Sequence, residues 1–137
     1  MKKVLVVVLC LMALSVAAAY WKTSGDSAAP ALHTEFEQAD IRIDVQTEST
    51  DLKPMHEAHF DVTLTDSSGK RLTASKVEMT YAMPRMFCGQ FNADVKQVTQ
   101  GTYLAVGVPV MEGYWEAKIT VVVNENRLTI KHPFRVT

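Results

Sequence analysis

Apolar and polar residues alternate along most of the chain after position 40, and this period of two constrains the fold more than any other feature. Successive side chains of a β-strand point to opposite faces, so alternation predicts strands with one buried face. The alternating runs cover residues 41–46, 60–65, 77–83, 91–98, 102–108, 115–121 and 127–136. No convincing helical period follows residue 22. Strands at this spacing predict an all-β, immunoglobulin-like antiparallel β-sandwich of about seven strands.

The first part of the chain has a different composition. Lys2 and Lys3 precede an uncharged run over residues 4–19 that is apolar except for Ser15 and ends in three alanines. A positive start, an apolar segment and small residues at its end are typical of a secretory signal peptide, whereas Tyr20 and Trp21 would suit the interface of a retained membrane anchor. Both interpretations stay open, and both place the domain outside the cytoplasm. The expected location is the periplasm or the outer face of the cytoplasmic membrane.

These features divide the chain into three parts. Residues 1–21 are predicted to be a signal peptide or a membrane-anchor helix. Residues 22–38, which are polar and contain Pro30, are predicted to be a flexible tether. Residues 39–137 are predicted to form the β-sandwich domain.

The connections between predicted strands fall into two chemical classes. The second, fourth and sixth carry ordinary turn residues, at 66–70, 99–101 and 124–126. The first, third and fifth contain proline beside methionine, at 54–56, 83–88 and 109–111. If successive strands run antiparallel, all odd-numbered connections lie at one end of the sandwich. Alternation therefore predicts that the methionine-containing loops gather there, with the sulfurs of Met83 and Met111 pointing inward at the rim of the core.

That end of the domain is predicted to offer soft metal ligands. Thioethers and a thiolate select Cu(I) over Mg²⁺ or Ca²⁺, and neutral imidazole also suits copper. The candidate copper ligands are Met83, Met86, Cys88, Met111 and His56. The alternative is structural: Cys88 is then a buried small hydrophobe and the methionines form an apolar cap.

The remaining histidines are weaker candidates. His59 falls opposite the apolar parity of its strand and is expected to face solvent, and a zinc site with His56 is disfavoured because the two side chains would face opposite sides. His132 shares parity with apolar neighbours and is expected to be a hydrogen-bonded histidine near the core. Pro133 marks the last strand as a sheet edge.

Several function classes find no support. The formal net charge of −1 leaves no basic field for nucleic acid. Ser67 and Ser68 lie in a turn without a base nearby in the pattern, and no phosphate-binding glycine loop occurs, so the chain is not expected to be an enzyme. Cys88 also lacks a resolving cysteine for redox chemistry.

Several sequence elements together resemble the YtkA-like domain family, close to the FixH-type accessory proteins. The specific ones are Met83-Pro84-x-Met86 and Met111-x-Gly113-x-Trp115, with Asp66-x-x-Gly69-Lys70 and Gly101-x-Tyr103 in support; the resemblance covers roughly the last 60% of the chain, from about Pro54 to Val136. It implies an extracytoplasmic immunoglobulin-like domain with a role in copper handling or in assembly of membrane oxidases. By position, Met83, Met86 and Met111 match the family's methionines, and Cys88 stands where another methionine is common.

Two functions follow as hypotheses. The first is a copper-binding accessory or chaperone protein that holds Cu(I), with a membrane oxidase or transporter as its partner. The second is a metal-free interaction module that docks on a membrane complex of the cell envelope through its apolar loops, Phe87 and Val110 included.

Overall fold

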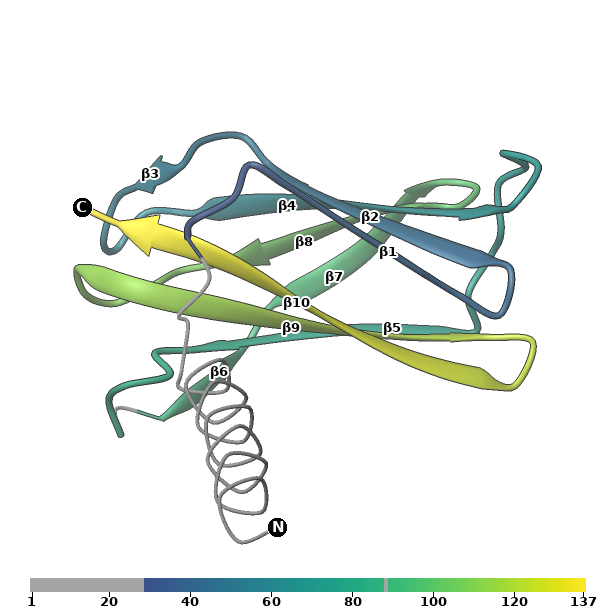
Figure 1. Ribbon diagram of the computed structural model, residues 1–137. Helices are drawn as coiled ribbons and strands as arrows, with labels where there is room; N and C mark the ends of the chain where they lie inside the picture. The colour runs from purple at the N-terminus through teal and green to yellow at the C-terminus, as the bar shows by residue number, and fades with distance from the viewer. Residues whose placement is uncertain (1–28, 88) are drawn as a thin grey trace, which may run out of the picture.

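The computed structural model describes residues 29–87 and 89–137, and this part of the chain is all-β, with ten strands and no helix (Figure 1). The strands are β1 (His33–Gln38), β2 (Ile41–Thr47), β3 (Asp51–Leu52), β4 (Ala58–Asp66), β5 (Lys76–Ala82), β6 (Gln90–Asn92), β7 (Asp94–Thr99), β8 (Thr102–Gly107), β9 (Gly113–Val123) and β10 (Asn126–Val136). The predicted N-terminal signal or anchor helix lies outside the described residues. Within them, no helix is long and apolar enough to cross a membrane.

The strands form two five-stranded sheets, in the orders β1-β2-β4-β8-β7 and β3-β10-β9-β5-β6. All neighbours pair antiparallel except β3 and β10, which pair in parallel over two residues. The prediction of an all-β sandwich is therefore confirmed, whereas the expected number of about seven strands was too low. β3 pairs only with Arg135 and Val136 of β10, so in the described part of the chain no strand pairs with the outer side of β10 at Pro133, as predicted for a sheet edge.

The period-two pattern places the core where the sequence predicted it. The largest fully buried side chains are Trp115, Phe60 and Phe134, which come from both sheets. Phe134 stacks on Trp115 with ring centroids 6.3 Å apart and meets Phe60 edge-on at 5.1 Å. Burial of each such ring removes a large apolar area from water, and the two inner faces are held together mainly by this effect.

The prediction of a flexible tether over residues 22–38 is wrong for its last six residues. His33–Gln38 form β1, which pairs antiparallel with β2 along its whole length. The turn between them uses Ala39 and Asp40, both at positive φ, as two-residue hairpins require. The strand was missed because an edge strand buries little: only Thr34 and Phe36 are partly covered.

The predicted strand over residues 91–98 is two strands in different sheets. β6 pairs with β5, and β7 pairs with β8 in the opposite sheet. The chain changes sheet at Ala93, whose amide donates to the carbonyl of Met79 at 2.9 Å. Apolar parity continues through this point, so the alternation alone carries no sign of the change.

The connections between strands lie at the two ends of the sandwich (Figure 1). The loop pole consists of the connections over residues 48–57, 83–89 and 108–112. The turn pole consists of the connections at 39–40, 66–75, 100–101 and 124–125. At the loop pole the amide of Met55 donates to the carbonyl of Pro109 at 2.8 Å, which joins the first and fifth connections. The third connection follows directly from Ala82, which pairs with Glu116 near the start of β9. The predicted meeting of the odd-numbered connections is confirmed.

Candidate metal-binding site at the loop pole

A tight turn holds two of the predicted ligands. The amide of Met86 donates to the carbonyl of Met83 at 3.2 Å, and Pro84 occupies the turn position that its fixed φ favours. Met83 continues the inward row of β5 and is 6% exposed, whereas Met86 is 53% exposed. The Met83 methyl group lies against Gly113, in the space that a Cβ there would occupy. The turn thus offers one buried and one accessible thioether.

Met111 lies in the bend that precedes β9. Its carbonyl accepts a hydrogen bond from Trp115 Nε1 at 3.0 Å, which fixes the backbone of the fifth connection to the core. The prediction that its side chain points inward is wrong, because Met111 is 37% exposed. Strand parity applies only from Gly113, where β9 begins, and does not reach two residues back into the bend. The Met83 methyl group contacts Gly113, which follows Met111 by two residues. The two methionines therefore still lie on adjoining stretches of chain.

The first connection contributes an imidazole. The Nδ1 atom of His56 lies 2.9 Å from the carbonyl of Pro54, and a carbonyl can only accept, so Nδ1 carries the proton in the neutral ring. The lone pair is then on Nε2, which is the atom available to a metal. The His56 side chain is exposed, as a ligand that must meet an incoming ion would be.

Met55 was not among the predicted ligands, although the structure places it at the same pole. It is 69% exposed and its backbone is hydrogen-bonded to Pro109 in the fifth connection. Its φ of 62° lies in the left-handed region, which is uncommon for a residue with a Cβ. The pairing of a proline with a methionine in this loop was the available signal.

Cys88 lies outside the described residues, so its prediction as a ligand is not tested. Its neighbours in the chain belong to the loop pole: Phe87 is fully exposed and Gly89 has a φ of 100°. In the part of the chain with described positions, no three His, Cys, Asp or Glu side chains gather in a way that could hold a metal ion. The described candidates at the loop pole are the thioethers of Met83, Met86 and Met111 and the imidazole of His56.

The other histidines occupy the positions predicted for them. His59 faces solvent, and its ring nitrogens lie 3.6 Å from Glu48 and 3.4 Å from Glu57. His132 is fully buried, and its Nδ1 atom is hydrogen-bonded to Thr34 Oγ1 at 2.8 Å. Burial, with a smaller effect from His33, lowers the pKa of His132 to about 4. These polar contacts of the two rings are made with Glu48, Glu57 and Thr34 and not with the methionines of the loop pole.

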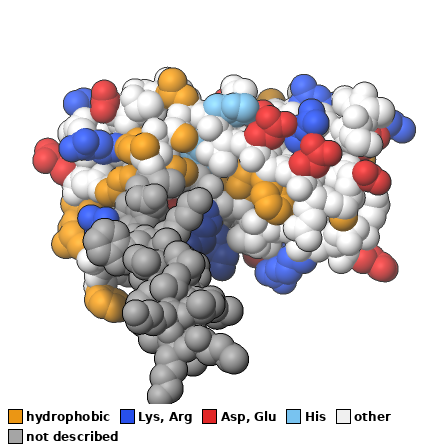
Figure 2. Space-filling view, in the orientation of Figure 1, with side chains coloured by type: hydrophobic (Ala, Val, Ile, Leu, Met, Phe, Trp, Pro, Cys, Tyr) orange, Lys and Arg blue, Asp and Glu red, His pale blue; other side chains and the backbone are white. Residues whose placement is uncertain are grey.

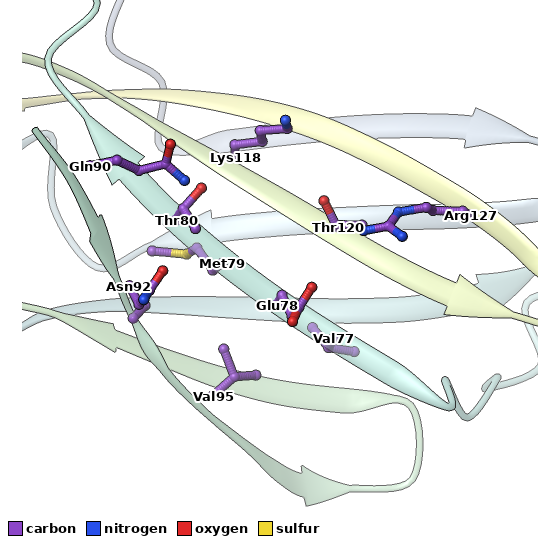
Figure 3. A pocket seen from close by; sticks show the side chains of 11 residues that line it. Val77, Glu78, Met79, Thr80, Gln90, Asn92, Val95, Lys118, Thr120 and Arg127 are labelled. Atoms are coloured by element: carbon purple, nitrogen blue, oxygen red, sulfur yellow. The ribbon is translucent and has the colours of Figure 1, made fainter.

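A hollow of the described surface lies on the outer face of the second sheet. It is an open groove of about 490 Å³ beside β5, β6 and β9, with polar residues of their outer faces along it (Figure 3). Thr80, Gln90 and Asn92 lie along one part of it, and Lys118 and Arg127 along another. It contains no predicted ligand.

Comparison with known proteins supports the fold alone. No family model matches the chain, and no curated protein matches it. A DUF4426 family protein from Pseudomonas aeruginosa has a similar structure, with a TM-score of 0.61 at 14% identity over 76% of this chain and 94% of the other. A DUF4785 family protein from Legionella pneumophila gives a TM-score of 0.56 at 9% identity over 73% of this chain. This chain spans only 29% of that protein's length.

A third similar structure is the ZirS C-terminal domain, with a TM-score of 0.51 at 14% identity over 84% of this chain and 85% of the other. These likenesses show that the two-sheet sandwich recurs in other proteins. The resemblance to the YtkA-like family stays a prediction from sequence, since none of these neighbours bears that name.

Proposed function

We propose that the protein is an extracytoplasmic copper-binding accessory or chaperone protein, as its resemblance to YtkA-like and FixH-type proteins implies. In this proposal, copper is cargo, held as Cu(I) by Met83, Met86, Met111 and Cys88, with His56 as a further ligand. A membrane oxidase under assembly, or a transporter, receives it. The proposal is supported by one observation: the loops that contain the described candidates Met83, Met86, Met111 and His56 meet at a single end of the sandwich.

The chemistry of the donor set fits this cargo. Thioether sulfur is a soft, neutral ligand that suits Cu(I) and discriminates against hard cations. Met83 is held at the rim of the core, whereas Met86 and Met111 are accessible. The two outer sulfurs can therefore bind an incoming ion first, and the sulfur of Met83 can then complete its coordination shell. A thiolate at Cys88 would make binding tighter and dependent on pH and redox state.

A competition titration with Cu(I) tests the proposal. The combined change Cys88→Ser and Met86→Ala is expected to lower the affinity by more than about tenfold, since two of four sulfur ligands are lost. The matched control is Met79→Leu, which changes a methionine that is 2% exposed in the core of β5 and should leave the affinity unchanged. Unchanged affinity after the combined change would end the proposal.

A metal-free interaction module is the second candidate, favoured by the full exposure of Phe87. An aromatic ring held in water at the tip of a rigid scaffold is typical of a recognition surface. This function predicts a protein partner whose capture survives a copper chelator and is lost in Phe87→Asp. Capture that requires copper would instead support the first proposal.

A further inference from the structure

The exposed apolar side chains of the domain are concentrated at one end. Eight large apolar side chains are exposed in the described part of the chain, namely Leu32, Met55, Met86, Phe87, Val98, Val108, Val110 and Met111. All but Val98 belong to the loop pole or to the segment that leads into β1. Figure 2 shows the apolar side chains gathered toward the end where Figure 1 places the β5–β6 and β8–β9 loops. Apart from Val98, they form an apolar tip drawn from the three loops and the segment before β1.

The chain joins the domain beside this tip. The amide of Ala31 donates to the carbonyl of Pro133 at 3.0 Å, and the carbonyl of Leu32 accepts from Thr47 at 2.9 Å, where β2 ends at the loop pole. Pro133 lies three residues from Val136, the end of β10 at that pole, or roughly 10 Å at the usual rise of a strand. The far end of β10, at Asn126, is about twice as distant.

The sequence upstream of this junction carries an apolar run. Residues 4–19 contain no charge, and nine residues, 20–28, separate the run from Ala29. Nine residues span at most about 30 Å when fully extended. If the run is retained in a bilayer, this short connection keeps the loop pole near the membrane surface. The turn pole, about 20 Å from the junction, reaches the same surface only if the connection spans roughly two thirds of its greatest length.

We propose that the loop pole docks directly on the lipid bilayer, with Phe87 and Met86 inserted at the level where headgroups meet acyl chains. Transfer of aromatic and thioether side chains from water to this depth lowers the free energy of the system. Arg85, next to Met86 in the chain, and Lys53, in the first connection of the same pole, are exposed and suit the phosphates of the lipid headgroups. The inference rests on the retained-anchor interpretation. It places the proposed copper site at the membrane, but the docking itself does not depend on bound copper.

Fluorescence quenching in vesicles tests the docking. The full chain is reconstituted, with a copper chelator present, into phosphatidylcholine and phosphatidylglycerol vesicles that contain brominated acyl chains. Tryptophan is introduced at the tip by Phe87→Trp and, as the matched control, at the turn pole by Ser68→Trp. Both positions are exposed, and Ser68→Trp removes only the surface hydrogen bond from its hydroxyl to Asp66, so both variants should stay folded at the temperature of the measurement. The native Trp21 and Trp115 give the same background in each, which subtraction of the parent removes.

The proposal predicts that brominated lipid removes most of the added emission in Phe87→Trp and little of it in Ser68→Trp. Equal quenching of the two variants, or none in either, would overturn it. Absence of quenching at position 87 in pure lipid would indicate that the apolar tip is covered by a protein partner or by the protein's own apolar run instead of by lipid. Neither result bears on the copper titration, which is made without lipid.

Discussion

The connections at the two poles of the sandwich differ in the side chains that they contain and in how those side chains are satisfied. At the turn pole, the polar groups of the loops satisfy one another: Asp66 Oδ1 accepts hydrogen bonds from the amide and hydroxyl of Ser68 and from the amide of Lys70. At the loop pole, proline shapes the backbone and apolar side chains are left in water. The turns of the first pole are satisfied within the domain, whereas the loops of the second expose apolar side chains that could bind a partner.

Two buried tyrosines show how similar the scaffold beneath the poles is. Tyr103 Oη accepts from the amide of Ala74 at 2.9 Å and fixes a loop of the turn pole. Tyr81 Oη accepts from the amide of Val108 at 3.0 Å and lies 3.3 Å from its carbonyl, at the loop pole. Each pole therefore has a loop tied to the core by one hydroxyl. The difference between the poles lies in what the loops expose, which points to function as its cause.

The largest expected effect concerns the closure of the turn pole. Gly101 has a φ of 72°, and a Cβ there would lie 3.0 Å from the carbonyl oxygens of Leu64 and Leu72. Gly101→Ala should lower the free energy of unfolding by about 4 kcal/mol, from backbone strain together with overpacking against backbone that cannot move away. Urea denaturation measures this loss.

Gly69→Ala is the matched control for that change. Gly69 also has positive φ, at 86°, but a Cβ there would meet nothing within 4 Å. Strain alone should then cost about 1 kcal/mol. Equal losses for the two variants would show that the turn pole is less tightly closed than its contacts indicate.

A pH dependence is expected from the segment that joins the domain beside the loop pole. His132 binds Thr34 of β1 in its neutral form, and burial lowers its pKa from 6.5 to about 4. The unfolded chain therefore binds more protons between these values, so stability should fall as the pH drops through this window. The loss attributable to this group approaches about 3 kcal/mol near pH 4.

His132→Gln isolates the effect, because the amide does not titrate. Urea denaturation at about pH 7 and about pH 4.5 should show a smaller difference between the two pH values in this variant than in the parent. A parent protein whose stability is flat across the window would contradict the assignment.

The smallest effect separates the poles most sharply. Tyr81→Phe and Tyr103→Phe each leave backbone groups without their hydroxyl partner and should each cost about 1–2 kcal/mol in the free energy of unfolding. Only Tyr81→Phe loosens the connection that carries Met111, so only this variant should weaken Cu(I) binding. Equal effects of both on Cu(I) affinity would show that the loop pole has no special part in binding.

Much of this contrast could be predicted from the sequence. Alternation identified the core residues Phe60 and Trp115, and the parity of the connections placed the proline–methionine loops together. Both depend on local periodicity, which the amino-acid pattern records directly. The prediction for Met83 was correct for the same reason, since it extends the inward row of β5.

The parts that were missed depend on tertiary pairing. β1 is an edge strand whose charged residues, such as Glu35 and Glu37, look like those of a solvated tether. The change of sheet at Ala93 leaves the parity intact, and Met111 lies in a bend where parity does not apply. Met55 was overlooked although Pro54 precedes it, and its hydrogen bond to Pro109 shows that it lies at the loop pole.

The most direct measurement is copper-edge X-ray absorption on the Cu(I)-loaded protein with its methionines replaced by selenomethionine. If sulfurs from the loop pole share one ion, copper should have selenium neighbours in the labelled protein, and fewer of them after Met83→Leu, with Met79→Leu unchanged. A copper shell of nitrogen and oxygen alone, with no selenium, would contradict the account.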